Sequence, residues 1–336
     1  MARKIGKRTI EFENKPHIAS YGSVVGKKEH EGPLSEEFDL YTTDSFFGEE
    51  TFEKAESKLQ KTAVQTALDR VGMNKDDVDN IFAGDLLNQC IGSSFGLREF
   101  GIPFIGLYGA CSTMALSTGL ASLFIDCGAA KNAVAVTSSH FCSAERQYRF
   151  PLNYGSQRTQ TAQWTVTGSG ALLLNRHGKG PYINSVTFGE IEDYGIKDTN
   201  NMGAAMAPAA ASTLLHFFED TGTSAEDYDI IYTGDLGYVG TNLLYDLLER
   251  EKVDIRCRHS DCGLIIFDRE KQDVHAGGSG CGCSAAVLCS FIMHRFEHND
   301  FSNILFMSTG ALMSPTSAYQ GESIPGIAHL LNIKKD

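Results

Sequence analysis

The sequence predicts an α/β protein made of two similar halves, with mixed or mostly parallel sheets covered by helices. Two observations lead to this fold class. One stretch of the chain recurs 150 residues later, and a second recurs in the same order. Helical patterns also alternate with short apolar strands in both copies, which is typical of α/β proteins.

The first repeat pairs residues 72–86, GMNKDDVDNIFAGDL, with residues 222–236, GTSAEDYDIIYTGDL. Each copy follows an amphipathic helix, at about 53–71 in the first half and about 204–219 in the second, and each leads into a short apolar strand. The identical positions include the tripeptide Gly-Asp-Leu at the end of both strands. We therefore expect two equivalent units.

The second repeat concerns two helices of small residues. Gly109-Ala110-Cys111 opens a helix that leads to the strand NAVAVTSS, and Gly280-Cys281-Gly282 opens another that leads to NILFMSTG. Small side chains let backbones approach closely, so we expect these helices to pack on each other between the sheets. The first half is expected to span residues 1–180 and the second residues 181–336.

Composition excludes several classes of protein. The 29 Lys and Arg against 42 Asp and Glu give a net charge of −13, which argues against nucleic-acid binding and against docking on anionic lipid by charge alone. No apolar run approaches 18 residues, and the basic N-terminus has no apolar run behind it, so we expect neither a transmembrane helix nor a secretory signal. Nine cysteines in a long chain indicate reduced thiols rather than a disulfide framework.

Two segments lack clear periodicity. Residues 18–47 are expected to form a long surface loop, and residues 147–164 a cap over a pocket.

Cys111 follows a short apolar strand at 103–107 and stands at the start of the small-residue helix. A helix N-terminus favours a thiolate and also holds anions, so this position suits either a nucleophile or a carboxylate ligand. An inert core cysteine is the structural alternative.

A resemblance to a known family sharpens this interpretation. YGACST and TVTGSGALLL, on duplicated halves, resemble the thiolase and ketoacyl-synthase superfamily. Together with NIFAGDLLNQ, TSSHFCSAERQYRFP, MGAAMAPAAA, YTGDLGYVGTNLL, HSDCGLIIF, GGSGCGCSA and STGALMSPTS, they resemble the stage V sporulation protein AD family of spore-forming bacteria, from about Arg8 to Leu331. The resemblance implies a thiolase-like duplicated fold, layered αβαβα with two buried central helices.

The superfamily's condensing enzymes combine a cysteine with a histidine and an asparagine. The histidine motif matches 233–237 and the asparagine motif matches 281–286, which puts Gly234 and Gly282 at the two catalytic positions. Losing one oxyanion donor typically costs ~10² to 10³ in rate. We therefore expect a binding protein without catalytic residues.

The resemblance further implies that the protein binds dipicolinate (pyridine-2,6-dicarboxylate), together with calcium, and supports its uptake into the developing spore. It implies peripheral association with the spore inner membrane beside other proteins of the same transport system, and a homodimer formed through the first half. No resident cofactor or metal is expected. The expected ligand-binding residues are Cys111, Asn88, His140, Met202, Gly234 and Gly282.

Two other functions stay open: an acyltransferase or condensing enzyme that uses Cys111, with Cys281 or Cys283 as a second thiol, and a structural scaffold of a membrane transport complex. Three smaller constellations give weaker signals. Cys257, His259 and Cys262 imitate a zinc site loosely, and the repeated Asp85 and Asp235 fit turn caps better than an acid–base pair. The last is a group of arginines that suits carboxylate recognition or a solvated basic face: Arg146, Arg149 and Arg158.

Overall fold

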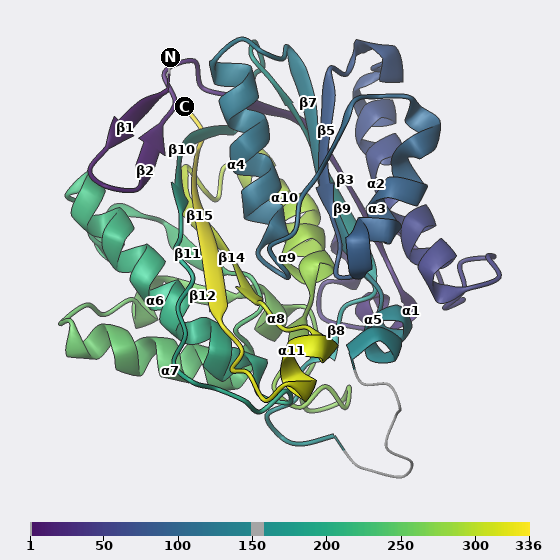
Figure 1. Cartoon of the computed structure of the whole chain (residues 1–336). Helices are drawn as coiled ribbons and strands as arrows, with labels where there is room; N and C mark the ends of the chain where they lie inside the picture. The colour runs from purple at the N-terminus through teal and green to yellow at the C-terminus, as the bar shows by residue number, and fades with distance from the viewer. Residues whose placement is uncertain (1, 149–157) are drawn as a thin grey trace.

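The computed structural model describes residues 2–148 and 158–336 (Figure 1). Ten strands follow one another in hydrogen-bonded order and fall into two groups of five. The first group comprises, in spatial order, β3 (His17–Val25), β9 (Gly168–Asn175), β7 (Asn132–Ser139), β5 (Asn80–Gly84) and β6 (Phe104–Gly106). The second comprises β10 (Tyr182–Phe188), β15 (Gly326–Lys334), β14 (Asn303–Ala311), β11 (Ile230–Thr233) and β12 (His259–Asp261).

The two groups have the same topology. In each, the first two neighbouring pairs are antiparallel and the last two are parallel. A single residue pair, Tyr182 with His17, joins the groups through β10 and β3. The mixed sheets and the equivalence of the units are as the sequence predicts.

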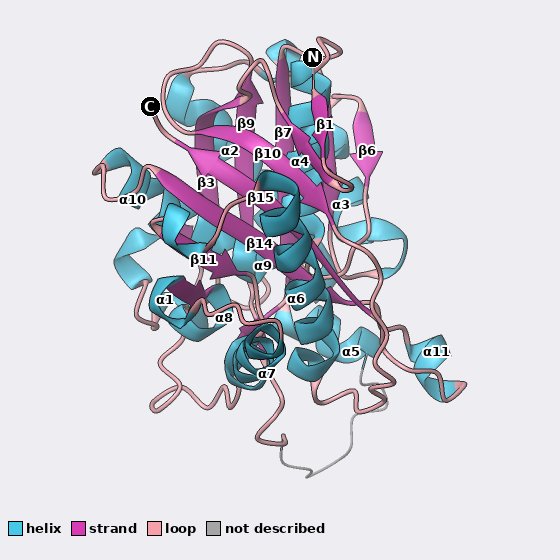
Figure 2. Ribbon diagram, turned by 90° about the vertical axis from the view of Figure 1, so that its left-hand side faces the viewer, coloured by secondary structure: helices cyan, strands magenta, loops and turns pink. Residues whose placement is uncertain are grey.

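Helices form three layers around the two groups of strands (Figures 1 and 2). The helices α4 (Thr113–Asp126) and α9 (Cys281–Val287) contact each other, and α4 packs on strands of both groups. All seven residues of α9 are buried. The outer layers are α2 (Phe52–Val71) with α3 (Ile91–Leu97) over the first group, and α6 (Met202–Thr221) with α7 (Gly237–Arg250) over the second. This is the expected αβαβα arrangement with two buried central helices.

The repeated residues perform the same structural task in both halves. Gly72 and Gly222 end α2 and α6 in the left-handed conformation, at φ 63° and 66°, where glycine is favoured. The carboxylates of Asp79 and Asp229 accept hydrogen bonds from the backbone N–H groups that begin β7 and β14. The duplication is thus visible in hydrogen bonds as well as in the order of strands.

The sequence predicts a surface loop at 18–47, and this prediction is wrong for residues 18–25. Residues 17–25 form β3, which pairs with β9. A strand covered on both faces needs no apolar–polar alternation. A Cβ added at Gly22 would lie 2.4 Å from the carbonyl oxygen of Ala63 in α2, so the helix packs directly on the strand here. The missing periodicity therefore reflects close packing.

The N-terminus crosses the expected boundary between the halves. The strands β1 (Arg3–Ile5) and β2 (Thr9–Glu11) form a hairpin, and β2 pairs with β10 of the second group. The boundary at residues 180 and 181 stays a prediction. The remaining short elements are α1 (Lys27–His30), β4 (Leu40–Tyr41), α5 (Phe141–Tyr148), β8 (Trp164–Thr165), α8 (Cys262–Ile265), β13 (Gly278–Ser279), α10 (Met293–Glu297) and α11 (Pro315–Tyr319).

Within the described part of the chain, every helix falls short of the length and apolarity that a membrane crossing demands.

Candidate functional site

A tight turn delivers Cys111 to the head of α4. Ala110 has a positive φ of 49°, and Ser112 is the N-cap residue of the helix. Gly310, near the end of β14, lies against this turn: a Cβ there would come within 2.4 Å of the carbonyl oxygen of Gly109. A side chain at position 310 would therefore displace the turn that carries the thiol.

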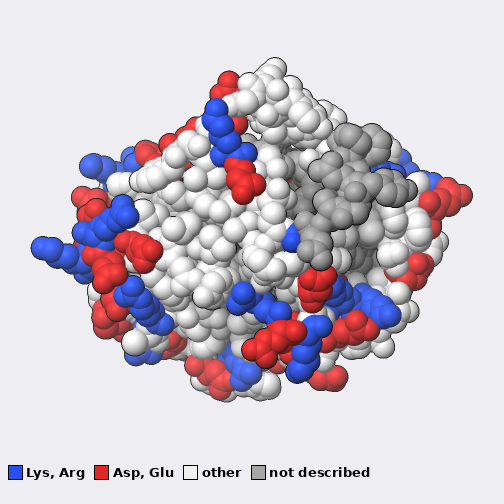
Figure 3. Space-filling model, turned by 90° about the horizontal axis from the view of Figure 1, so that it is seen from below, with Lys and Arg blue, Asp and Glu red and all other residues white. Residues whose placement is uncertain are grey.

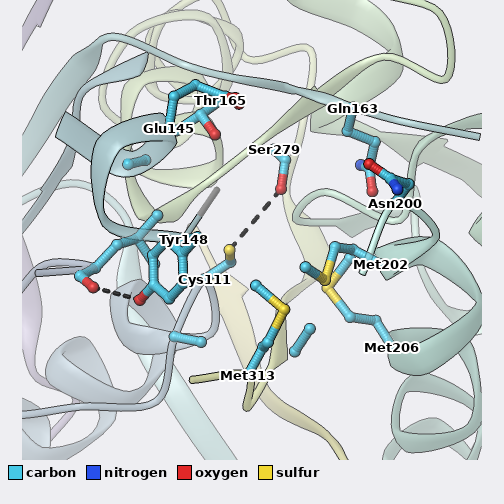
Figure 4. Close-up of a pocket in the computed structure, with 14 residues that line it drawn as sticks. Cys111, Glu145, Tyr148, Gln163, Thr165, Asn200, Met202, Met206, Ser279 and Met313 are labelled. Atoms are coloured by element: carbon cyan, nitrogen blue, oxygen red, sulfur yellow. Dashed lines mark hydrogen bonds between the residues drawn. The ribbon is translucent and has the colours of Figure 1, made fainter. Parts of the chain in front are cut away.

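Cys111 faces a narrow pocket of about 70 Å³, where a single water needs about 10–15 Å³ (Figure 4). The elements α4, α5, β8, β13, α6 and β14 meet around it. The apolar part of the lining is Leu86, Ala110, Ala144, Met202, Met206, Ala311 and Met313, and the polar part is Glu145, Tyr148, Gln163, Thr165, Asn200 and Ser279. The described lining includes neither histidine nor Lys or Arg.

The pocket belongs to an end of the molecule that is poor in charge. In Figure 3, which views the molecule from below, Lys, Arg, Asp and Glu gather around the edge while uncharged atoms fill much of the middle. Glu145 is the one charged residue in the described lining. This setting favours a ligand without a large uncompensated charge.

The thiol of Cys111 has polar neighbours on one side. Its Sγ lies 4.0 Å from Oγ of Ser279, which in turn donates to the carboxylate of Asp235. Burial, followed by the negative charge of Asp235, raises the thiol pKa well above its usual range. Cys111 precedes the first helical residue by two positions, so the expected support of a thiolate by the helix N-terminus is weak, and burial beside a carboxyl acts against a thiolate.

Asp235, behind the pocket lining, holds together the segments around Ser279 and Thr309. Its carboxylate accepts hydrogen bonds from Oγ1 of Thr309 (2.7 Å), Oγ of Ser279 (3.0 Å) and the N–H of Gly280 (3.0 Å). Burial raises its pKa, although these hydrogen bonds oppose the rise. The twin residue Asp85 accepts from the N–H of Leu87 and of Ser93. Asp85 caps the turn that follows its strand, as predicted, whereas the carboxylate of Asp235 bridges two distant segments, at 279–280 and at Thr309.

The structure separates the six residues expected to bind a ligand. Cys111 and Met202 line the pocket, and their contact with a ligand stays a prediction. Asn88 is exposed, and its N–H donates to Gln147. His140 is buried and lines a different cavity, where its Nε2 lies 2.8 Å from the carbonyl oxygen of Ser45.

Gly234 and Gly282 are absent from the described pocket lining. A Cβ at Gly234 would lie 3.1 Å from Cα of Ser308, and one at Gly282 would lie 2.4 Å from the carbonyl oxygen of Gly168. Both positions therefore point into packed backbone. From these two segments the side chains that approach Cys111 are Asp235 and Ser279.

The two thiols considered as a second catalytic cysteine are packed groups. Cys281 donates to the carbonyl oxygen of Ala110 at 3.0 Å, and Cys283 to that of Gly234 at 3.5 Å. Burial raises both pKa values well above the usual range. His259 contacts Thr233 and Tyr245 through its two ring nitrogens, and no group of three His, Cys, Asp or Glu side chains able to hold a metal occurs within residues 2–148 and 158–336.

The arginine group is dispersed. Arg146 pairs with Glu53, and Arg158 lies 5.0 Å from the Trp164 ring and donates to the carbonyl oxygen of Asp273. Arg149 lies outside the described residues, as does half of the segment expected to cap the pocket.

Sequence reasoning missed several lining residues. Tyr148 and Gln163 stand in the segment without periodicity, and Met206 and Met313 look like ordinary core residues. Gln163 donates from Nε2 to the carbonyl oxygens of Asp235 and Gly278, which no sequence pattern reveals. The one available signal was the aromatic content at 148–164.

Comparison with known proteins identifies the family. The family model described as stage V sporulation protein AD matches residues 6–334. Stage V sporulation protein AD of Bacillus subtilis (strain 168) is 43% identical over 324 residues, which cover 96% of each chain. The chain belongs to the stage V sporulation protein AD family. Membership of this family gives the protein a role in sporulation.

Solved structures place this family member among thiolase-like folds. The 3-oxoacyl-[acyl-carrier-protein] synthase III of Aquifex aeolicus VF5 is similar with a TM-score of 0.60 at 12% identity, covering 95% of this chain and 99% of the synthase. Cerulenin-bound OleA of Xanthomonas campestris has a TM-score of 0.61 at 13% identity, covering 96% and 97%. At this level of identity the likeness shows the fold alone.

Proposed function

We propose that this protein binds dipicolinate in the Cys111 pocket, without acyl-transfer chemistry, and supports its uptake into the developing spore. The observation that carries the proposal is the set of side chains that surround the thiol of Cys111. Cys111 faces a hydroxyl and a carboxyl, while no histidine belongs to the described lining. A protonated thiol beside a carboxyl, without an imidazole that could pair with the thiolate, is a poor nucleophile.

The size and polarity of the pocket suit a small planar ligand with polar edges. Methionine and alanine side chains offer apolar contact, and Ser279, Thr165, Asn200 and Tyr148 offer hydroxyl and amide groups. Methionine adapts its shape to a ring. Dipicolinate has this character.

Calcium is expected to bind together with the ligand, as its counter-ion. The described lining holds the acid Glu145 and neither Lys nor Arg, so a bare dianion would lack a compensating charge there. The complex of one calcium ion with one dipicolinate is neutral overall. We therefore expect the calcium complex to bind more tightly than free dipicolinate.

Calorimetric titration tests the binding. Purified protein should release or absorb heat with dipicolinate plus calcium, and Ala311→Phe should weaken the interaction at least tenfold by filling the pocket. Ala129→Phe, the same change at an exposed position, serves as the control. Equal affinity in Ala311→Phe and the original protein would remove the pocket from the proposal.

The acyltransferase alternative has its own test. Condensing enzymes share the fold, and Cys111 stands at a strand–turn–helix junction. Incubation with acetyl-CoA followed by intact-mass measurement should leave the mass unchanged. An added acetyl group on Cys111 would favour the enzyme.

Uptake requires membrane proteins as partners, because a dicarboxylate with its metal ion does not cross a hydrocarbon layer unaided. We propose that the protein sits at the spore inner membrane as a peripheral subunit of that transport system. Spore membranes should carry it and release it on washing at high salt or alkaline pH. Recovery only in the soluble fraction would contradict this location.

We also propose a homodimer formed through β6. This strand ends the first group of strands, and apolar side chains near it are exposed: Phe95 (58%), Phe104 (41%) and Tyr108 (47%). A second copy could pair with this open edge and cover them. Sedimentation should give a dimer for the original protein and a monomer for Phe104→Glu, whereas a monomer in both would contradict the proposal.

A further inference from the structure

A second cavity adjoins the Cys111 pocket and contains His140. It measures about 310 Å³. The two cavities share α5 and β8: Phe141 and Trp164 line the second cavity, whereas Ala144 and Thr165 line the first. Neighbouring residues of a strand point to opposite sides, so β8 acts as a wall between two spaces.

Lys28 supplies a positive charge to the lining of this cavity, which also contains the acids Glu29 and Asp44. The Nζ of Lys28 lies 3.9 Å above the ring of Trp164. The other aromatic wall is Phe141, whose ring stacks on Trp164 with centroids 3.7 Å apart. Burial lowers the pKa of Lys28. The charges of Asp273, Glu29 and Glu31 oppose this fall, but none of these acids is in direct ion-pair contact with Lys28, so the ammonium keeps donors for an incoming anion.

Glu29 adds an unpartnered polar atom to the same lining. The residue is 1% exposed, and its Oε1 accepts a hydrogen bond from the N–H of Thr167 at 2.9 Å. Oε2 has no hydrogen-bond partner among the described residues. Burial raises the pKa of Glu29 to about 7. A proton on this carboxyl resides on Oε2, because Oε1 is already an acceptor, and Oε2 then becomes a donor toward a ligand.

We propose that this cavity is a second ligand site, which takes a small aromatic carboxylate with its carboxylate on Lys28 and its ring along the edge of the Trp164–Phe141 stack. Glu29 supplies the second polar contact. Dipicolinate belongs to this class, so the protein would hold the same ligand at two neighbouring positions on either side of β8. The choice of ligand rests on the proposed function, whereas the site does not.

Trp164 makes the site observable because it is the single tryptophan of the chain and lies in the lining. Dipicolinate is titrated with calcium while indole emission is recorded, with excitation at the red edge of the absorption band. We expect a change in emission, and calorimetry should give two equivalents per chain. Lys28→Met should remove the emission change and one equivalent, and the exposed Lys4→Met should keep both.

The variant Ala311→Phe distinguishes binding in the Cys111 pocket from binding at this second site. That variant should keep the emission change and lose the other equivalent. If Ala311→Phe still binds two equivalents per chain, the proposed binding in the Cys111 pocket is wrong, while the proposal of the second site is unaffected. If Lys28→Met, with an unchanged melting temperature, keeps both equivalents and the emission change, the second site is overturned. Loss of the emission change in Ala311→Phe would overturn the second site as well.

Discussion

The thiol of Cys111 has two polar neighbours, the hydroxyl of Ser279 and the carboxyl of Asp235. Neither can take its proton as an imidazole would, and the carboxyl makes the thiolate less favourable. The same superfamily scaffold that presents a nucleophile can thus present a neutral, weakly polar group to a ligand. What the residue does is decided by its neighbours more than by its place at the head of a helix.

This environment predicts low reactivity. At pH 8, Cys111 should react with iodoacetamide more slowly than the exposed Cys127 and Cys257, because its raised pKa keeps it a thiol. Asp235→Asn removes the nearby charge and should lower the thiol pKa, which speeds alkylation several-fold. Peptide mass spectrometry gives the rates.

Asp85→Asn, which changes the twin aspartate in the first half, should leave the rate at Cys111 unaltered. A Cys111 that is alkylated fastest in the original protein would disprove the assigned environment.

The sequence predicts the strands and central helices correctly, because both copies of each repeat show the same pattern. It does not predict which side chains enter the pocket, because a shift of one position changes the direction of a side chain. The offsets of 150 and 171 residues are sufficient to predict equivalent strands and two central helices. A shift of one residue at a strand end turns a side chain to the other face, which is why Asp235 rather than Gly234 approaches Cys111. Asn88 and His140 also follow strands, but the turns after β5 and β7 carry them away from the pocket. Turn geometry of this kind leaves no periodic signal in sequence.

The packing around Gly234 predicts that the supposed catalytic histidine cannot be restored. Gly234→His would place a Cβ 3.1 Å from Cα of Ser308 and 3.3 Å from Cβ of Ser284, with the ring still to be accommodated. Overpacking of this kind costs about 1–3 kcal/mol or more, so urea unfolding should show a clear loss. The exposed Asn242→His should cost less than about 0.5 kcal/mol. A stable Gly234→His variant that transfers acyl groups would contradict this geometry.

A second pair of repeated aspartates, Asp79 and Asp229, predicts matched effects on the stability of the two halves. Asp79→Ala and Asp229→Ala each remove the acceptor for two backbone N–H groups at the start of a strand. Each should lower the free energy of unfolding by about 1 kcal/mol, since the sites are exposed. Chemical denaturation measures this loss. A large loss at one site and none at the other would show that the halves are not equivalent in energy.

At the scale of the whole molecule, several acids are buried between layers. Glu29, Glu56 and Asp261 are each 1% exposed, and burial raises their pKa values to about 7, 8 and 7. Above their ordinary pKa near 4, the folded state holds protons that the unfolded state releases. Stability should therefore fall as the pH rises from about 5 to about 8 through these groups.

Glu56→Gln tests this dependence, because it keeps the hydrogen-bonding shape beside Ser143 and Ser138 without a charge. The drop in unfolding free energy between pH 5 and pH 8 should shrink by on the order of 2 kcal/mol. Thermal melting at the two pH values gives the comparison, with the exposed Glu226→Gln as control. An identical drop in the original protein and Glu56→Gln would contradict the assignment.

The central claim, that the pocket at Cys111 binds dipicolinate without reacting with it, is tested most directly by one measurement. A crystal structure of the protein grown with dipicolinate and calcium should show the ring beside Sγ of Cys111, in contact with Met202 and Met313 and without a covalent bond to sulfur. A Cys111 pocket that stays empty at saturating ligand, or a thioester on Cys111 after exposure to acetyl-CoA, would contradict the account.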